Sequence, residues 1–396
     1  MAGVSVLISG IGVAGPTLAY WLDRFGHRPT LVEQAPRLRG GGYVVDFWGV
    51  GYDVAERMGL LPALRREGYN VQELRLVDAS GRRVGGFGVD VFRKLTHGRY
   101  LSIARSGLAA AIYRAVEGRC EAIFGDRITN LAQDDRGVLV EFARAPIRRF
   151  DCVIGADGQH SAVRALAFAS EDRFERYLGY AVAAFEAEGY RPRDEGVYVS
   201  YCLPGRQIAR FALRDDRTLF LFVFAAPAAG ADDINGGKAA KALLHATFAG
   251  AGWESPRILA ALDRCDELYF DRVSQIRMQS WSRGRIGLLG DAAFCPSLLA
   301  GQGSALAMAA AYVLAGELAE STIETALERY EERLRPFIEG KQKAAQRLAS
   351  SFVPATRLGL FVRNQVTKML GLPFVADMAI GRSVLDRFEL PSYPIR

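Results

Sequence analysis

A glycine motif set between two apolar stretches restricts the fold of this chain more than any other feature. An apolar run over residues 4–9 precedes the sequence G-x-G-x-x-G at 10–15, a helical stretch follows, and a second apolar run ends on Glu33. Continuous apolar strands are typical of a parallel sheet that is covered on both faces. The order of strand, glycine turn, helix and strand therefore predicts a Rossmann-like α/β domain that binds a dinucleotide.

Each glycine of the motif has a physical role in such a site. Gly10 permits a tight turn, Gly12 lets the backbone approach a pyrophosphate, and Gly15 lets the helix pack closely on the strand. The helix then directs its free amides and positive dipole at the phosphates. Glu33 can accept hydrogen bonds from ribose hydroxyls, and its charge disfavours a 2′-phosphate. The motif alone does not distinguish FAD from NAD.

The composition excludes several other classes of function. The chain has 396 residues, with 50 Lys and Arg against 44 Asp and Glu, and the signs are interspersed, which indicates a solvated surface and not a nucleic-acid track. Five cysteines form no C-x-x-C pair, and the four histidines are not at metal-ligand spacing, so we expect neither a disulfide framework nor a metal site. The cysteine usage and the lack of a basic leader at the N-terminus predict a cytoplasmic protein.

A long uncharged stretch follows Asp291. The next 25 residues carry no charge, which is long enough to cross a bilayer. Pro296, Gly301 and Gly303 interrupt this stretch, so we expect no stable membrane insertion. The sequence predicts instead a loop and then a helix from about Ser304 that is buried on all sides. The N-terminus of that helix would offer free amides to a neighbouring anion.

Two further segments carry a family resemblance. Residues 151–164, DCVIGADGQHSAVR, resemble the DG fingerprint of class A FAD-dependent monooxygenases, the p-hydroxybenzoate hydroxylase family. Residues 284–303, GRIGLLGDAAFCPSLLAGQG, resemble the GD fingerprint of the same family. With the glycine motif, these segments occur in the family's order across nearly the whole chain. The GD segment and GGYVVDFWGVGYDVAERMGL at 41–60 are similar to the branch that contains tetracycline-inactivating monooxygenases.

The resemblance implies an enzyme that binds FAD and consumes O2 together with NADPH or NADH. Reduced flavin in this family traps O2 as a C4a-hydroperoxide, whose distal oxygen goes to an electron-rich carbon of the substrate. The substrate implied is a small aromatic or polycyclic molecule, polyketide-like or tetracycline-like, with a phenol or enol group. Because the chemistry is centred on the flavin, no side chain is assigned with certainty as catalytic.

The glycine motif and the resemblance together assign the cofactor-binding residues. The candidates are Gly10, Gly12, Val13, Ala14, Gly15, Glu33, Gly42, Arg105, Asp157, Gly158, Asp291, Gly301 and Gly303. Ser161 and Arg164 are further candidates in the DG segment, and a structural ion pair is the alternative for Arg164. The candidates for substrate contact are Tyr43, Trp48, Phe211, Phe222 and Pro296. Core packing is the alternative for the aromatic residues among them.

The chain departs from the family's pattern at two positions. Many relatives have a histidine where this chain has Phe294, and an asparagine where it has Ala305. Phe294 cannot ionise, so the resemblance does not carry over any proton relay that depends on that position.

Apolar alternation over residues 177–225 predicts antiparallel strands without intervening helices. These strands, with a hairpin around Ser80 and Gly81, indicate a separate sheet inserted into the FAD-binding domain. The expected division is an FAD-binding domain at 1–71, 101–176 and 270–340, a substrate-binding domain at 72–100 and 177–269, and a C-terminal helical segment at 341–396. The last helix is amphipathic and basic, so it either bridges the domains or lies on a membrane surface.

Three other functions are compatible with this sequence. An FAD-dependent reductase of the same fold would share all three motifs and form a saturated product without O2. A flavin-holding protein would sequester its ligand with little turnover, and a plain NAD-binding module would need only the first motif. The sequence does not decide the substrate or the nicotinamide, and it is compatible with a monomer or a homodimer.

Overall fold

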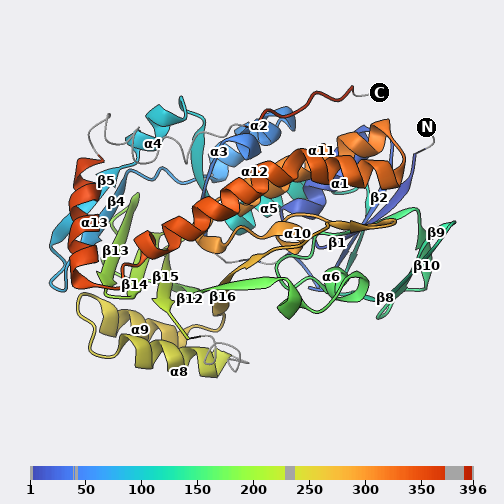
Figure 1. Ribbon diagram of the computed structural model, residues 1–396. Coiled ribbons are helices and arrows are strands. Elements are labelled where there is room, and N and C mark those ends of the chain that lie inside the picture. The colour runs from blue at the N-terminus through green and yellow to red at the C-terminus, as the bar shows by residue number, and fades with distance from the viewer. Residues whose placement is uncertain (1–2, 39, 41–42, 228–236, 371–387, 395–396) are drawn as a thin grey trace.

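The computed structural model describes residues 3–38, 40, 43–227, 237–370 and 388–394 (Figure 1). One of its sheets has six strands in the order β17-β18-β11-β1-β2-β7. The strands from β18 to β7 are parallel, and β17 pairs antiparallel with β18 at one edge. Their bounds are β1 (Ser5–Ser9), β2 (Arg28–Glu33), β7 (Glu121–Phe124), β11 (Cys152–Gly155), β17 (Ser282–Arg283) and β18 (Ile286–Leu288). The predicted Rossmann-like sheet is therefore confirmed.

The helices beside this sheet are held by apolar packing. Helix α1 (Ala14–Arg24) follows the glycine turn and packs against β1, β2 and α11 (Gly303–Glu320). Every residue of α11 from Ala305 to Leu318 is buried, which confirms the predicted helix without a solvent face. The shorter helices of this part are α2 (Val50–Arg57), α3 (Leu61–Glu67), α5 (Arg105–Arg114), α6 (Ala162–Ala167), η1 (Glu171–Arg173), α10 (Asp291–Phe294) and η2 (Leu298–Ala300).

A second sheet has seven strands in the order β16-β12-β15-β14-β13-β4-β5. All neighbouring strands are antiparallel except β13 and β4, which pair in parallel. The hairpin expected around Ser80 and Gly81 is formed by β4 and β5. The bounds are β4 (Glu73–Val77), β5 (Arg83–Gly88), β12 (Glu175–Glu188), β13 (Val197–Leu203), β14 (Arg206–Ala212), β15 (Arg217–Ala225) and β16 (Tyr269–Ile276).

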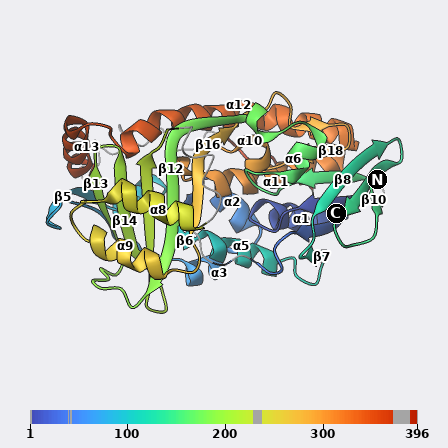
Figure 2. The same cartoon turned by 90° about the horizontal axis from the view of Figure 1, so that it is seen from below.

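The two faces of the seven-stranded sheet contact different parts of the molecule. Helices α8 (Gly237–Phe248) and α9 (Ser255–Arg264) cover one face (Figure 2). Four phenylalanines of this face pack in one cluster with residues of these helices, namely Phe185, Phe220, Phe222 and Phe224. Phe211 belongs to a different cluster, on the opposite face, together with Tyr198, Tyr69 and Tyr100.

Two smaller β-structures complete the described strands. A three-stranded sheet contains β8 (Ile128–Asp134), β9 (Gly137–Phe142) and β10 (Arg148–Phe150). A two-stranded ribbon pairs β3 (Val44–Trp48) with β6 (Tyr100–Ala104) in antiparallel register. Helix α4 (Asp90–Leu95) precedes β6. The ribbon packs one of its faces toward Tyr198 and Phe211 of the seven-stranded sheet.

The C-terminal part of the chain spans the length of the molecule. Helix α12 (Ile323–Phe352) runs from the region of α11 to the seven-stranded sheet (Figure 1), and α13 (Arg357–Met369) packs on β5 and β13. Residues 388–394 return to α11, where the Tyr393 hydroxyl donates to Glu317 Oε1 at 2.7 Å. None of the described helices combines the length and the hydrophobicity that crossing a bilayer requires.

Candidate active site

The glycine turn between β1 and α1 is built as the motif predicts. Gly10 has a positive φ of 106°, and a Cβ atom there would lie 2.5 Å from the Ala156 carbonyl oxygen. A Cβ atom on Gly15 would collide with the Gly10 carbonyl oxygen, so Gly15 sets the close packing of helix on strand. A Cβ atom on Gly12 would meet no atom within 4 Å. The turn is therefore compact at two glycines and open at the third, where a pyrophosphate would need space.

The three motifs meet at one edge of the six-stranded sheet. A Cβ atom on Gly10 would lie 2.9 Å from Asp157 Cα, so the first motif touches the DG segment. A Cβ atom on Gly290 would lie 3.4 Å from Ala14 Cβ and 3.3 Å from Ala307 Cβ, so the GD segment touches both α1 and α11. Because β1, β11 and β18 are parallel, their carboxyl ends bring these segments together.

Glu33 ends β2 beside the glycine turn. Its Oε2 accepts a hydrogen bond from the Ile11 amide at 2.9 Å, and its Oε1 accepts one from the Ala35 amide at 3.0 Å. The carboxylate is thus fixed in orientation next to the open side of the turn, at the position where a ribose is expected. Val13 and Ala14 are buried in the first turn of α1. Gly42 lies outside the residues that the structure describes.

Asp157 and Arg164 have structural partners. Asp157 accepts hydrogen bonds from the Ser161 hydroxyl at 2.5 Å and from the Val163 amide at 3.1 Å, which fixes the start of α6. Burial raises the pKa of Asp157, and these hydrogen bonds oppose the rise. Arg164 is fully buried, donates to the Ala292 carbonyl at 2.9 Å and forms an ion pair with Glu171 at 2.6 Å. Arg164 therefore joins the DG segment to the GD segment. This is the structural ion pair that the sequence analysis gives as the alternative to a role in binding.

Three polar side chains interact near the start of α5, namely Tyr43, Arg105 and Asp291. The Arg105 amide donates to the Tyr43 carbonyl at 3.0 Å. Burial raises the pKa of Tyr43 to about 12, while the Arg105 charge opposes the rise and the Asp291 charge adds to it. Burial also raises the pKa of Asp291, against the effect of Arg105. Arg105 is nevertheless exposed, and Tyr43 and Asp291 are partly exposed, so solvent reaches these groups and they are not part of the closed core.

The N-terminus of α11 faces Asp291. A Cβ atom on Gly303, the first residue of the helix, would lie 3.4 Å from Asp291 Oδ1. The first amides of an α-helix have no partner within the helix, and its dipole is positive at this end. Gly301 has a φ of 65°, and the preceding loop contains the buried Pro296. The uncharged stretch thus provides partial positive charge without a charged side chain.

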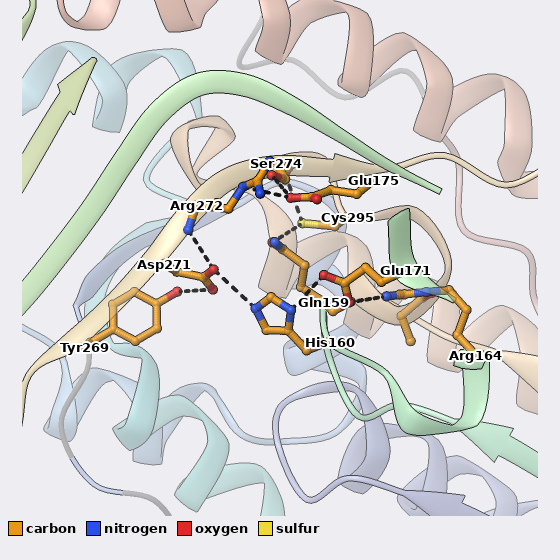
Figure 3. A network of polar contacts seen from close by, with 11 residues as sticks. Gln159, His160, Arg164, Glu171, Glu175, Tyr269, Asp271, Arg272, Ser274 and Cys295 are labelled. Carbon is orange, nitrogen blue, oxygen red and sulfur yellow. Dashed lines mark hydrogen bonds and ion pairs between the residues drawn. The ribbon is translucent and has the colours of Figure 1, made fainter. Parts of the chain in front are cut away.

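A network of charged side chains connects the DG segment with β16 (Figure 3). His160 Nδ1 lies 2.8 Å from Glu171 Oε1, and His160 Nε2 lies 3.2 Å from Asp271 Oδ1. The hydrogen bonds to Asp271 and Glu171 raise the pKa of His160 to about 10, so the imidazole is positively charged at neutral pH. The Tyr269 hydroxyl donates to the other oxygen of Asp271 at 3.2 Å. The sequence reasoning missed Tyr269 and Asp271, because nothing in β16 distinguishes them from ordinary surface residues.

The predicted substrate residues do not all lie on the same side of the seven-stranded sheet. The Tyr43 ring is 6.3 Å from the Tyr269 ring, and Phe211 faces the β3-β6 ribbon. Phe222 is on the opposite face of the sheet, where its ring contacts Phe248 of α8 at 5.2 Å. The prediction of substrate contact is wrong for Phe222, because residues on opposite faces of a sheet cannot line the same recess.

Both departures from the family's pattern are accommodated by packing. The Phe294 ring is buried and lies 4.7 Å from the Trp281 ring, so this side chain points into the core. Ala305 packs against Gly51, where an added Cβ atom would collide with it. The small residues Gly51 and Ala305 let α2 approach α11. Within the described ranges, no three His, Cys, Asp or Glu side chains are grouped so that they would hold a metal ion.

Comparison with known proteins gives concordant results. Residues 3–345 match the family model described as FAD binding domain. A flavin-dependent monooxygenase of an unknown prokaryotic organism is 34% identical over 396 residues, which cover 98% of this chain and 99% of that protein. A flavin-dependent monooxygenase of Legionella longbeachae is 30% identical and covers 98% of each chain. The crystal structure of the tetracycline destructase Tet(55) superposes with a TM-score of 0.85 at 29% identity, covering 99% of this chain and all of that one.

Proposed function

The chain belongs to the FAD binding domain family and is an FAD-dependent monooxygenase, and on this premise we propose that it hydroxylates an aromatic or polycyclic small molecule with electrons from NADPH or NADH. The observation that carries the proposal is the meeting of the glycine turn, the DG segment and the GD segment at one sheet edge. Beside that edge, Tyr43 packs against both the main core and a cluster with aromatic residues of the second sheet. An elongated dinucleotide and a flat substrate fit such an arrangement.

The residues at the sheet edge fit FAD. The open backbone at Gly12 and the N-terminus of α1 would hold the pyrophosphate, and Glu33 would accept hydrogen bonds from the adenosine ribose. Arg105 and Asp291 would contact the ribityl and phosphate part. The first turn of α11 would face the pyrimidine edge of the ring. We propose that the FAD-binding domain holds the six-stranded sheet and that the substrate-binding domain holds the seven-stranded sheet. The boundaries expected at 269/270 and 340/341 fall inside β16 and α12, so these two elements cross them.

The protein contributes orientation, exclusion of water and stabilisation of charge. Bound flavin would activate O2 and would transfer one oxygen atom from O2 to the substrate. The free amides of α11 would stabilise negative charge on the reduced ring without the reorganisation that a solvated side chain would need. Tyr43 is protonated at neutral pH, as an ordinary phenol is, and burial raises its pKa further, to about 12. Its hydroxyl would therefore be a hydrogen-bond donor to a bound ligand. The buried helix α11 keeps water away from this end of the site.

We place the substrate in a recess between the β3-β6 ribbon and the seven-stranded sheet. The partly exposed rings of Tyr100 from the ribbon and Tyr198 from the sheet support this placement, and Tyr198 is stacked on the buried Phe211. Rings at a boundary between two packed units favour flat apolar ligands. The relationship to a tetracycline destructase supports a polycyclic phenol or enol as one class of substrate.

Ligand-dependent consumption of nicotinamide tests this function. FAD-loaded protein is mixed with NADPH or NADH, and tetracyclines and small phenols are screened for acceleration of the oxidation. We expect at least one ligand to accelerate the oxidation strongly and to be converted to a hydroxylated product. Oxidation that no ligand accelerates would favour the ligand-sequestering alternative. Formation of a saturated product without O2 would favour the reductase.

A further inference from the structure

We infer that Asp46 and the aromatic side chains around it form a recognition site for a positively charged group of the substrate, such as an alkylammonium. This inference rests on the proposed function, since it concerns the substrate of the same enzyme. It follows from the position of the Asp46 carboxylate, from its hydrogen bonds, from the rings beside it and from the charges that surround it.

Asp46 points from the β3-β6 ribbon toward the seven-stranded sheet. Along β3 the side chains of Val45 and Phe47 are buried in the main core, so Asp46 and Trp48 lie on the other face. Asp46 pairs with Ser102 and Trp48 pairs with Tyr100 across the ribbon. This face of the ribbon is the one that packs toward Tyr198 and Phe211 of the seven-stranded sheet. Asp46 remains exposed between these two layers, so it borders open space.

The carboxylate is oriented by two hydroxyl groups on the same oxygen. Oδ1 of Asp46 accepts hydrogen bonds from Tyr100 at 2.5 Å and from Ser102 at 2.6 Å. Partial removal from water raises the pKa of Asp46, and both hydroxyls oppose this rise because they stabilise the ionised form. No described group donates to Oδ2, which leaves that oxygen available to a ligand.

No protein cation neutralises Asp46 in the part of the chain that the structure describes. The ion pairs of this region join other groups, such as Arg99 with Asp53 and Arg93 with Asp90. A carboxylate that is partly desolvated and has no positive partner is energetically costly. A cationic ligand group removes this cost, whereas a second anion increases it. The charge of the recess therefore selects positive groups over negative ones.

Aromatic rings surround the carboxylate on both sides. The rings of Trp48, Phe92 and Tyr100 form one cluster, with centroid separations of 6.0 to 6.3 Å. Tyr198 faces them from the sheet: burial raises its pKa, and the charge of Asp46 raises it further. Rings next to a carboxylate are the combination that binds alkylammonium groups, because the ring faces attract cations and the alkyl parts are apolar.

The experiment compares ligands that differ only in the charged group. The probes are tyramine against 4-ethylphenol, and tetracycline against 4-dedimethylaminotetracycline. Each is titrated into the oxidised FAD-loaded enzyme without nicotinamide, and binding is followed by the change in flavin absorbance. The variants are Asp46→Asn, which keeps the shape, and Asp46→Glu, which keeps the charge. Asp135→Asn serves as the control, because Asp135 is an exposed loop residue remote from β3 in the sequence.

We expect the wild type and the control to bind the amine of each pair about 10-fold more tightly than its neutral partner. Asp46→Asn should abolish this preference while its affinity for the neutral partners stays within about two-fold, and Asp46→Glu should retain part of the preference. Equal affinities in the wild type, or an unchanged preference in Asp46→Asn, overturn the inference. Neither result affects the proposed function, which fails only if no ligand accelerates nicotinamide oxidation.

Discussion

His160 and Asp271 are 111 positions apart in the chain, and their side chains meet at 3.2 Å between Nε2 and Oδ1. This contact joins the DG segment of the six-stranded sheet to β16 of the seven-stranded sheet (Figure 3). Glu171 holds the other nitrogen of the same imidazole. The relative position of the two sheets, and with it the shape of the recess between them, therefore depends in part on a charged histidine.

Replacement of His160 by Gln should destabilise the protein by about 1 kcal/mol at pH 7, because exposed ion pairs contribute at most about 1 kcal/mol each. The pKa of His160 rises from 6.5 to about 10 in the folded state. The charged form is thus favoured by folding, and its contribution is complete below pH 6.5 and is lost as the pH rises through 10. Urea unfolding of both proteins between pH 6 and pH 10.5 measures this. If the difference in unfolding free energy between the wild type and the variant stays constant across that range, His160 does not carry the raised pKa.

Gly12 and Gly15 should respond differently to the same substitution. Gly12→Ala adds a methyl group to open space, so we expect normal folding and weakened binding of FAD. Gly15→Ala places the methyl group against the Gly10 carbonyl oxygen, which should cost about 1–3 kcal/mol of stability. Thermal unfolding of the apoproteins and flavin titration separate the two effects. If Gly12→Ala binds FAD as the wild type does, the pyrophosphate does not approach this glycine.

Asp291→Ala should reduce flavin retention. Loss of a hydrogen bond to a charged group costs about 1.5–3 kcal/mol, which corresponds to roughly 10- to 100-fold weaker binding. The measurement is the ratio of flavin to protein absorbance after gel filtration, followed by titration with FAD. Asp266→Asn, an exposed carboxylate between α9 and β16, is the control. Unchanged flavin content in Asp291→Ala would remove Asp291 from the cofactor site.

Tyr393→Phe should cost about 1–3 kcal/mol of stability. The Tyr393 hydroxyl donates to Glu317 at 2.7 Å, and Glu317 is completely buried in α11 with Arg333 as its ion-pair partner. Removing the hydroxyl leaves Glu317 Oε1 with Arg333 alone, next to an Oε2 that has no partner among the described groups. Tyr113→Phe is the matched control, since the Tyr113 hydroxyl has no hydrogen bond within the described residues. Equal unfolding midpoints of the two variants would show that the tail residues 388–394 do not stabilise α11 in this way.

The local elements were predictable because their signals are contained in short stretches. The apolar run, the three glycines and Glu33 are close in sequence, so β1, α1 and β2 follow from the pattern. The uncharged stretch likewise predicts α11, because it has no polar face that could be exposed to water. That the three distant motifs lie together was predicted from the family resemblance, because no local pattern indicates it.

The proposed substrate recess was less predictable, because the residues around it come from separate sheets. Period-two alternation shows that Phe220, Phe222 and Phe224 share a face, but it does not show which face lies toward the cofactor. The prediction for Phe222 was wrong for that reason. The roles of Asp46 and Asp271 depend on partners that are distant in sequence. Ser102 is 56 positions from Asp46, and His160 is 111 positions from Asp271.

Isotope incorporation tests the central claim most directly. FAD-loaded enzyme is supplied with NADPH and a ligand that accelerates its oxidation, under an atmosphere of 18O2, and the product is analysed by mass spectrometry. The account predicts that one 18O atom enters each product molecule and that no product forms when O2 is absent. A product without 18O, or a product that forms equally well under nitrogen, would contradict the claim that this site oxygenates its substrate.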